Sequence, residues 1–144
     1  MKAVIQRVTS ASVSVDNETV GQIGNGYVVL LGVGKGDTKE HCEKMADKII
    51  NLRIFEDENG KINLSIKDVG GQLLIISQFT LYADCKKRRP GFIDAAPPDI
   101  ANELYEYFKA VCKNSIERVE CGIFGAHMNV KLENDGPFTV CLEI

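Results

Sequence analysis

Apolar and polar residues alternate near the amino terminus of the chain. From Lys2 to Val15 the β-branched residues dominate, and Val13 and Val15 fall on the same face of an extended backbone. A period of two residues is typical of a strand that buries one face. We therefore expect this segment to form a strand, a turn and a second strand.

Three further segments have the apolar content of strands. The run YVVLLGVG begins at Tyr27 and ends in glycines, which indicates a central strand buried on both faces. Residues 53–66 contain the turn DENG between RIF and KINLSI, a pattern that predicts a hairpin. The run QLLIISQF, residues 72–79, predicts another buried strand.

Two segments instead repeat apolar residues every three or four positions, as amphipathic helices do. The first follows Asp37 and Glu40, whose spacing lets both side chains bond the free amides of a helix start. The second follows the Pro97-Pro98-Asp99 start. The apolar positions are Cys42, Met45, Ile49 and Leu52 in the first, and Ile100, Leu104, Tyr107, Phe108 and Val111 in the second.

Residues 118–124, 127–133 and 138–144 complete the pattern as three short strands. The order is then strands, helix, strands, helix, strands, which predicts an α+β fold. We expect a mainly antiparallel sheet or partial β-barrel covered on one side by two main helices. At 144 residues, the chain has the size of a single domain, residues 1–144.

Composition narrows the class of protein. Apolar residues make up 44% of the chain and charged residues 26%, without any low-complexity tract, as in a compact globular protein. The amino-terminal segment has no continuous apolar stretch of a signal peptide, and no segment resembles a membrane span, so we expect a cytosolic protein. Five cysteines without CxxC spacing argue against a disulfide framework and a structural zinc site.

The net charge of −3 argues against a surface that binds polyanions everywhere. Positive charge is nevertheless concentrated at Lys86, Lys87, Arg88 and Arg89. Such a run is commonly a solvated loop, and it is also a candidate contact for nucleic acid phosphates.

The usual catalytic devices have little support in the sequence. His41 and His127 are the only histidines, too few for a typical metal centre, and neither lies in a nucleophile signature, so we interpret both as surface or structural residues. The segment GVGKGD, residues 32–37, matches neither phosphate-loop pattern in full and is interpreted as a turn.

Two polar segments remain as candidates for chemistry, SQFTLY at residues 77–82 and NDGPFTV at residues 134–140. Backbone amides at the end of a strand can stabilise an oxyanion during ester hydrolysis. Thr80 would add a hydroxyl as a hydrogen-bond partner or, without a visible base, as a poor nucleophile. NDG alone is a common hairpin turn, but a proline directly after it is unusual at the start of a strand. These patterns allow a hydrolytic site without requiring one.

The combination of motifs closely resembles the D-aminoacyl-tRNA deacylases over essentially the whole chain. The matching segments, in order, are MKAVIQRVTSASV at the start, SQFTLY (77–82), RPGF (89–92), FGAHM (124–128) and NDGPFTV (134–140). Members of that family are cytosolic homodimers that hydrolyse the ester between a D-amino acid, or glycine, and the terminal adenosine of tRNA. The resemblance implies no metal or organic cofactor.

The resemblance also implies roles for individual residues. Gly136 and Pro137 would form a chiral filter, with a cis peptide bond that reaches from one subunit into the pocket of the other, and Arg7 would hold that loop in place. The pocket floor would be Ser77, Gln78, Phe79 and Thr80, with backbone amides around Gln78, Phe79 and Thr80 stabilising the oxyanion. Further substrate contacts would come from Phe124, Ala126 and Met128, and tRNA contacts from Lys86, Lys87, Arg88 and Arg89.

Two positions depart from the family pattern, Gly91 in place of serine and Phe138 in place of valine. Two alternative functions also remain open at this point. One is a non-catalytic RNA-binding module that holds a terminal adenosine, and the other is a general esterase that acts on small activated esters.

Overall fold

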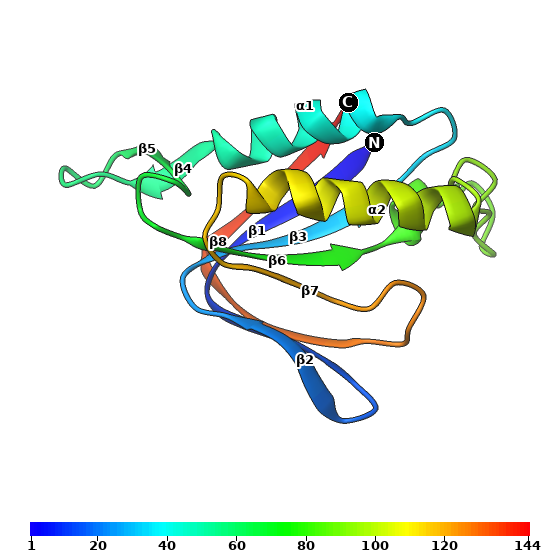
Figure 1. Ribbon diagram of the computed structural model, residues 1–144, viewed down its shortest axis with the longest axis horizontal. Coiled ribbons are helices and arrows are strands. Elements are labelled where there is room, and N and C mark those ends of the chain that lie inside the picture. The colour runs from blue at the N-terminus through cyan, green and yellow to red at the C-terminus, as the bar shows by residue number, and fades with distance from the viewer.

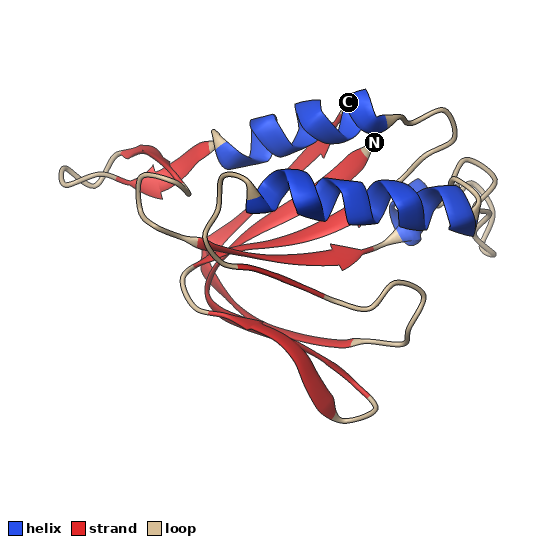
Figure 2. Ribbon diagram, in the orientation of Figure 1, coloured by secondary structure: helices blue, strands red, loops and turns tan.

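The computed structural model describes every residue from Met1 to Ile144. It contains one six-stranded sheet, a separate two-stranded hairpin, two α-helices and one short 3-10 helix (Figures 1 and 2). The elements along the chain are β1 (Lys2–Val15), β2 (Glu18–Ile23), β3 (Gly26–Gly32), α1 (Lys39–Ile50), β4 (Arg53–Glu56), β5 (Ile62–Ser65), β6 (Gln72–Ser77), η1 (Phe79–Tyr82), α2 (Pro98–Lys113), β7 (Val119–Cys121) and β8 (Asn129–Glu143).

The first strand, β1, organises the main sheet. Its residues 2–8 pair with β3 and its residues 11–15 with β2, while β8 pairs with β1 from residue 2 to residue 14, all in antiparallel orientation. Strands β3, β6 and β7 then follow as parallel neighbours. The sheet is therefore mixed and barrel-like, and the expected α+β class with a partial barrel and two helices is confirmed.

Each face of the sheet carries its own apolar core. In β3 the side chains of Tyr27 and Val29 face the helices, whereas that of Val28 faces the concave side enclosed by the curled ends of β1, β2 and β8. In Figure 1 both helices lie above the sheet, and β2 forms the lower end of the curled sheet. The unbroken apolar pattern of β3 follows from burial on both sides, since successive side chains of a strand point to opposite faces.

The helix boundaries agree closely with the sequence pattern, but the start of α1 does not use the expected cap. Thr38 is the N-cap, and the His41 ring, in place of Glu40, accepts a hydrogen bond from the Thr38 amide and lies 2.9 Å from the Thr38 hydroxyl. Asp37 precedes the N-cap by one residue, and its carboxylate instead accepts hydrogen bonds from the Gly34 amide and the Met1 ammonium. Neither α1 nor α2 is long and apolar enough to cross a membrane.

Three sequence expectations about strands were wrong in detail. The segment Lys2–Val15 is one continuous strand, because β3, β2 and β8 together pair with it along its length. From Asn129 to Glu143 the chain forms one strand, β8, that continues through the NDGP motif as a bulge. The segment after Ser77 leaves the sheet as η1, because its neighbour β3 ends at Gly32.

Candidate active site

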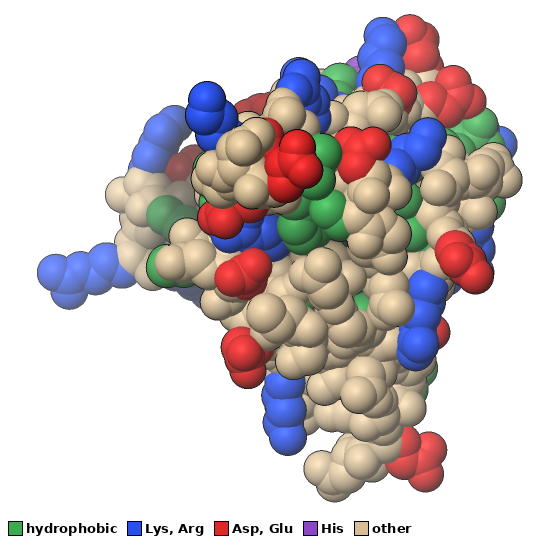
Figure 3. Space-filling model, turned by 90° about the vertical axis from the view of Figure 1, so that its left-hand side faces the viewer, with side chains coloured by type: hydrophobic (Ala, Val, Ile, Leu, Met, Phe, Trp, Pro, Cys, Tyr) green, Lys and Arg blue, Asp and Glu red, His purple; other side chains and the backbone are tan.

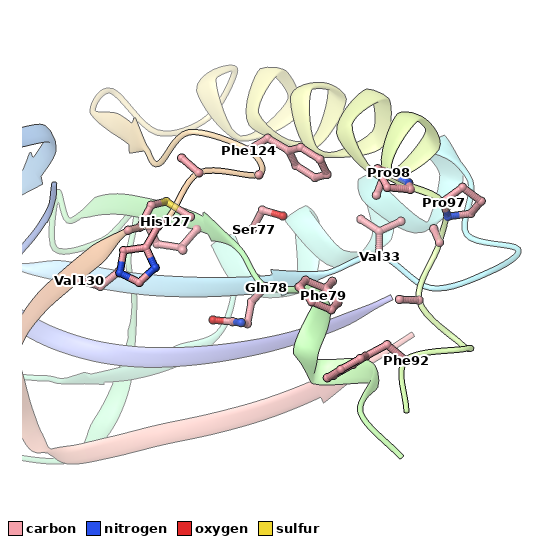
Figure 4. Close-up of a pocket in the computed structure, with 17 residues that line it drawn as sticks. Val33, Ser77, Gln78, Phe79, Phe92, Pro97, Pro98, Phe124, His127 and Val130 are labelled. Carbon is pink, nitrogen blue, oxygen red and sulfur yellow. The ribbon is translucent and has the colours of Figure 1, made fainter. Parts of the chain in front are cut away.

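A pocket of about 690 Å³ opens where the parallel strands β3, β6 and β7 end. Ligand sites in sheets with parallel strands commonly lie at the carboxyl ends of the strands, where the connecting loops can provide side chains. The pocket is lined by Val33, Ile76, Ser77, Gln78, Phe79, Phe92, Ala95, Ala96, Pro97, Pro98, Ala101, Phe124, Gly125, Ala126, His127, Met128 and Val130 (Figure 4).

The floor of the pocket is the junction of β6 and η1. The Gln78 amide donates to Leu31 O at 2.8 Å, the last bond that ties this segment to β3. The next two amides, of Phe79 and Thr80, belong to the first turn of η1, where backbone amides have no partner within the helix. The Gln78 amide is therefore already bonded within the chain, and the expected role of these three amides as oxyanion donors stays a prediction.

One wall of the pocket is apolar and comes from the segment before α2. Phe92 packs edge-on against Phe79 with ring centroids 5.0 Å apart. Pro97 and Pro98 lie at the same end of the pocket (Figure 4). The wall is attached to the end of β3 by a bond of 3.0 Å from the Ala96 amide to Val33 O.

The opposite wall follows β7. Gly122 donates its amide to Ile75 O at 3.0 Å, and a Cβ at Gly122 would clash with the Met128 sulfur, so this glycine allows the segment to fold tightly. The buried Tyr105 hydroxyl also donates to Ile75 O, at 2.8 Å, and burial raises the pKa of Tyr105. These contacts bring the predicted Phe124 and its neighbours against the end of β6.

The lining includes six of the predicted site residues, Ser77, Gln78, Phe79, Phe124, Ala126 and Met128. It also includes His127, the one histidine in the pocket, which we had interpreted as a surface or structural residue. Phe92, Pro97 and Pro98 had not been identified either. In the sequence, the one sign that His127 lines the pocket is its position between the predicted site residues Ala126 and Met128.

Thr80 lies beside the pocket floor and is not part of the lining. Its hydroxyl accepts a hydrogen bond of 2.5 Å from the Gln78 side-chain amide, and the residue is exposed. No hydrogen bond links it to a histidine or a carboxylate. This arrangement suits a hydroxyl that orients neighbouring groups better than it suits a nucleophile.

The predicted filter residues form a second, separate structure on β8. The Gly136–Pro137 peptide bond is cis, and Gly136 has a φ of 137°, in the region that favours glycine. Gln6 faces Thr139 and Val8 faces Asn134, so β8 has three extra residues opposite β1 at this point. Neither Gly136 nor Pro137 lines the pocket of its own chain.

Arg7 lies opposite this bulge and supports it. The buried guanidinium donates to Ile54 O (2.6 Å) and Asp135 O (3.1 Å), pairs with the Asp135 carboxylate (3.3 Å) and lies 4.9 Å from the centre of the Phe138 ring. At the other end of the bulge, the Phe138 amide donates to Asn134 Oδ1 at 2.6 Å. The departure at Phe138 therefore adds a ring that packs against the arginine.

The basic loop forms no salt bridge through any of its four charges, Lys86, Lys87, Arg88 and Arg89, which are all exposed. A short bridge between Asp84 and Gly91 closes the loop, and a Cβ at Gly91 would meet nothing within 4 Å. The family's serine would thus fit at this position. The face of the molecule in Figure 3 mixes charges of both signs, whereas residues 86–89 are all cationic.

The fold brings together no three histidine, cysteine, aspartate or glutamate side chains in a geometry that could hold a metal ion. Of the two histidines, His41 caps α1 and His127 lines the pocket. The segment GVGKGD forms the turn between β3 and α1, as the sequence suggested.

A family model described as D-Tyr-tRNA(Tyr) deacylase matches residues 4–143 of the chain. The chain belongs to this family. The resemblance seen in the sequence is therefore confirmed, and with it the expected enzyme class, since deacylases are hydrolases.

Curated relatives of the chain agree with this result. A D-aminoacyl-tRNA deacylase of Thermosipho africanus is 62% identical over 144 residues, which cover 99% of this chain and 97% of the relative. A protein of the same name from Clostridioides difficile is 56% identical over the same shares of both chains.

Two solved structures resemble this chain in fold. A protein named c-Myc DNA Unwinding Element Binding Protein has a TM-score of 0.96 and 44% identity, covering 100% of this chain and 99% of that one. A probable eukaryotic D-amino acid tRNA deacylase has a TM-score of 0.85 at 20% identity, covering 99% of this chain and 98% of that one, a likeness of fold alone.

Proposed function

We propose that this protein hydrolyses the ester between a D-amino acid and the 3′-terminal adenosine of tRNA, in the pocket at the ends of β3, β6 and β7. The observation that carries the proposal is the family match over residues 4–143, together with a pocket built from the segments that resemble the family. A substrate attached to tRNA is used where translation occurs, so the expected location is the cytoplasm.

Two features of the pocket support ester hydrolysis. Its aromatic and proline wall offers apolar surface to a bound ring, and the strand end at Ser77 offers polar atoms to the ester. Water, assisted by the neighbouring ribose hydroxyl, attacks the carbonyl, and the amides of Phe79 and Thr80 stabilise the oxyanion that forms. In a well-studied hydrolase one such donor is worth roughly 10²–10³ in rate.

The proposed active form is a homodimer in which Gly136 and Pro137 of one subunit enter the pocket of the other. Support comes from their position, because the bulge is exposed and lies outside the pocket of its own chain. The bulge backbone would occupy the space that the side chain of an L-aminoacyl group needs. Glycine has no side chain to be rejected, so glycine mischarged on tRNA is also a substrate in this proposal.

The basic loop would contact tRNA phosphates near the acceptor end. Its four cations have no acidic partner in the chain, although the protein is acidic overall. These cations can bind phosphates without first breaking an ion pair within the protein.

A second candidate is nucleic acid binding without catalysis. Two observations favour it. The basic residues of the loop form no ion pair, and one solved structure similar to this chain is named as a DNA unwinding element binding protein. In that case the pocket would hold a terminal nucleoside and leave the ester intact. Release of the amino acid separates the two functions directly.

The test is deacylation of D-tyrosyl-tRNA, L-tyrosyl-tRNA and glycyl-tRNA by the purified protein. We expect rapid release of D-tyrosine and glycine and slow release of L-tyrosine, with a dimeric mass in solution. Asp16→Asn, in the exposed hairpin between β1 and β2, serves as the control and should behave as the wild type. Binding of all three tRNAs without release would favour the second candidate, and an equal D and L rate would contradict the filter.

A further inference from the structure

The turn between β3 and α1, residues 32–37, contacts both the floor and one wall of the pocket. The wall segment is attached to it by two backbone bonds of 3.0 Å, from the Ala96 amide to Val33 O and from the Lys35 amide to Asp94 O. At its start, a Cβ added to Gly32 would approach Gln78 O to 3.1 Å, so the floor also lies against this turn. The turn therefore contacts both the floor and this wall of the pocket.

The buried side chain of Asp37 stabilises this turn through hydrogen bonds. Its carboxylate, only 8% exposed, accepts the Gly34 amide at 2.7 Å on one oxygen and the terminal ammonium of Met1 at 2.8 Å on the other. The Asp37 amide also donates to Gly34 O, at 3.2 Å. A buried carboxylate that uses both oxygens holds a turn more firmly than a neutral side chain, because charge-assisted bonds are the stronger kind.

Tyr82, the last residue of η1, packs on the same turn. A Cβ at Gly34 would lie 2.5 Å from the Tyr82 hydroxyl, so the ring lies directly on this glycine. Burial, and after it the negative charge of Asp37, raises the pKa of Tyr82 to about 12. The hydroxyl therefore stays protonated beside the carboxylate. The carboxyl end of η1 is held against the turn by the packing of the Tyr82 ring on Gly34.

We propose that Asp37 is a positioning residue of the pocket, which sets the distance between η1 and the 94–98 wall by fixing the turn on which both rest. The part that concerns catalysis rests on the proposed function, since it takes this pocket as the substrate site. Asp37 itself does not line the pocket, so it acts through Gly34, Tyr82 and the wall.

Asp37→Asn tests this role with little change in shape. An asparagine has one acceptor oxygen in place of two, so either the Gly34 amide or the Met1 ammonium loses its partner. We expect KM for D-tyrosyl-tRNA to rise about tenfold with kcat within about twofold of the wild type, since the walls bind substrate and the catalytic amides remain. The matched control is Asp16→Asn.

Amide hydrogen exchange provides a readout that does not depend on activity. In Asp37→Asn the amides of Lys35, Ala96 and Ala83 should exchange faster, because their bonds lie in the turn, the wall and the end of η1. The Asp57 amide, bonded to Lys61 O in the distant β4–β5 hairpin, should exchange at the wild-type rate.

The outcomes separate the two proposals. Wild-type exchange at Lys35, Ala96 and Ala83 overturns the positioning role, whatever the kinetics. Faster exchange with an unchanged KM supports the positioning role and shows that substrate does not bind in this pocket, which contradicts the proposed function. A raised KM with faster exchange supports both.

Tyr82→Phe keeps the inference testable should Asp37→Asn fail to fold. It removes only the hydroxyl beside Asp37, so the turn and the wall should be unaffected. We expect faster exchange at Ala83 alone and a rise in KM of about twofold to threefold, less than for loss of a charged partner. Wild-type exchange at Ala83 in this variant would overturn the connection between η1 and the turn.

Discussion

The pocket and the β8 bulge are stabilised in different ways. The pocket floor and walls are attached mainly by backbone bonds, such as those from Gln78 to Leu31, Ala96 to Val33 and Gly122 to Ile75. The bulge is held mainly by two side chains, those of Arg7 and Asn134, which bond its backbone at Asp135 O and Phe138 N.

This difference predicts where the protein tolerates change. Backbone bonds survive most substitutions, so the pocket should keep its shape when a lining side chain is altered. A bulge that depends on a guanidinium and a carboxamide should lose its shape when either is removed. Substrate binding and chiral selection are then separable by mutation, because they belong to regions with different supports.

The largest effect is expected from Arg7→Ala, which removes the main support of the bulge. It leaves the Ile54 carbonyl and the Asp135 carboxylate without their partner, and we expect a loss of about 2–4 kcal/mol in the free energy of unfolding. Urea denaturation measures this loss, and the ratio of D to L deacylation rates should fall with it. Arg118→Ala, which removes an arginine that is 52% exposed, is the control and should cost under about 1 kcal/mol. Equal stability of the two variants would contradict the role of Arg7.

Gly136→Ala should disturb the bulge alone. At φ 137° a side chain is strained, and the new Cβ would lie 2.9 Å from the Phe138 amide, so we expect a cost of about 1–3 kcal/mol. The ratio of D to L rates should fall, while binding in the pocket changes little. Gly91→Ala is the matched control, because its Cβ meets nothing within 4 Å. An unchanged ratio in Gly136→Ala would remove the bulge from chiral selection.

Thr80→Ala tests the pocket side of the comparison. The hydroxyl is exposed and bonds only the Gln78 side chain, so thermal stability should stay the same and the deacylation rate should fall by up to about tenfold without being abolished. Thr80→Ser keeps the hydroxyl and should retain the rate. Complete loss of activity in the alanine variant, or an acyl group trapped on Thr80, would instead make it a nucleophile.

The smallest effect on turnover is expected from alanine at all four positions of the basic loop. At saturating tRNA the rate should be unchanged, whereas the dependence of tRNA affinity on salt should flatten by about 0.9 log units for each duplex phosphate that the loop no longer neutralises. A variant with alanine at Lys39, Lys44, Lys48 and Lys109 removes the same charge elsewhere and should keep the wild-type slope. Equal slopes in the two variants would leave the loop without a role in tRNA binding.

The elements that could be predicted from sequence are those whose pattern is local. The helix α2 has a proline start and a regular apolar face, and it was placed within one residue of its observed start. The continuous apolar pattern of β3 likewise indicated burial on both faces. In these segments each residue's neighbours along the chain determine its structure.

The rest depends on partners far away in sequence. NDGP has the local pattern of a turn, but β8 continues through it because β1 pairs on both sides of the bulge. The wall residues Phe92, Pro97 and Pro98 meet the floor only because β3, β6 and β7 run parallel, which no local pattern specifies. The matched segments identified most of the floor, since family resemblance carries the tertiary information that periodicity lacks.

The pairing of β1 with β8 has a consequence for how the chain folds. Lys2 faces Glu143 and Ser14 faces Asn129, so the pairs that complete the sheet join residues separated by most of the polypeptide. Pairing over such long sequence separation slows folding, and synthesis on the ribosome proceeds from the amino terminus. A nascent chain therefore holds β1 with one edge unpaired until β8 has emerged. We expect a truncation within β8 to prevent folding of the whole chain, rather than to remove only the bulge that β8 carries.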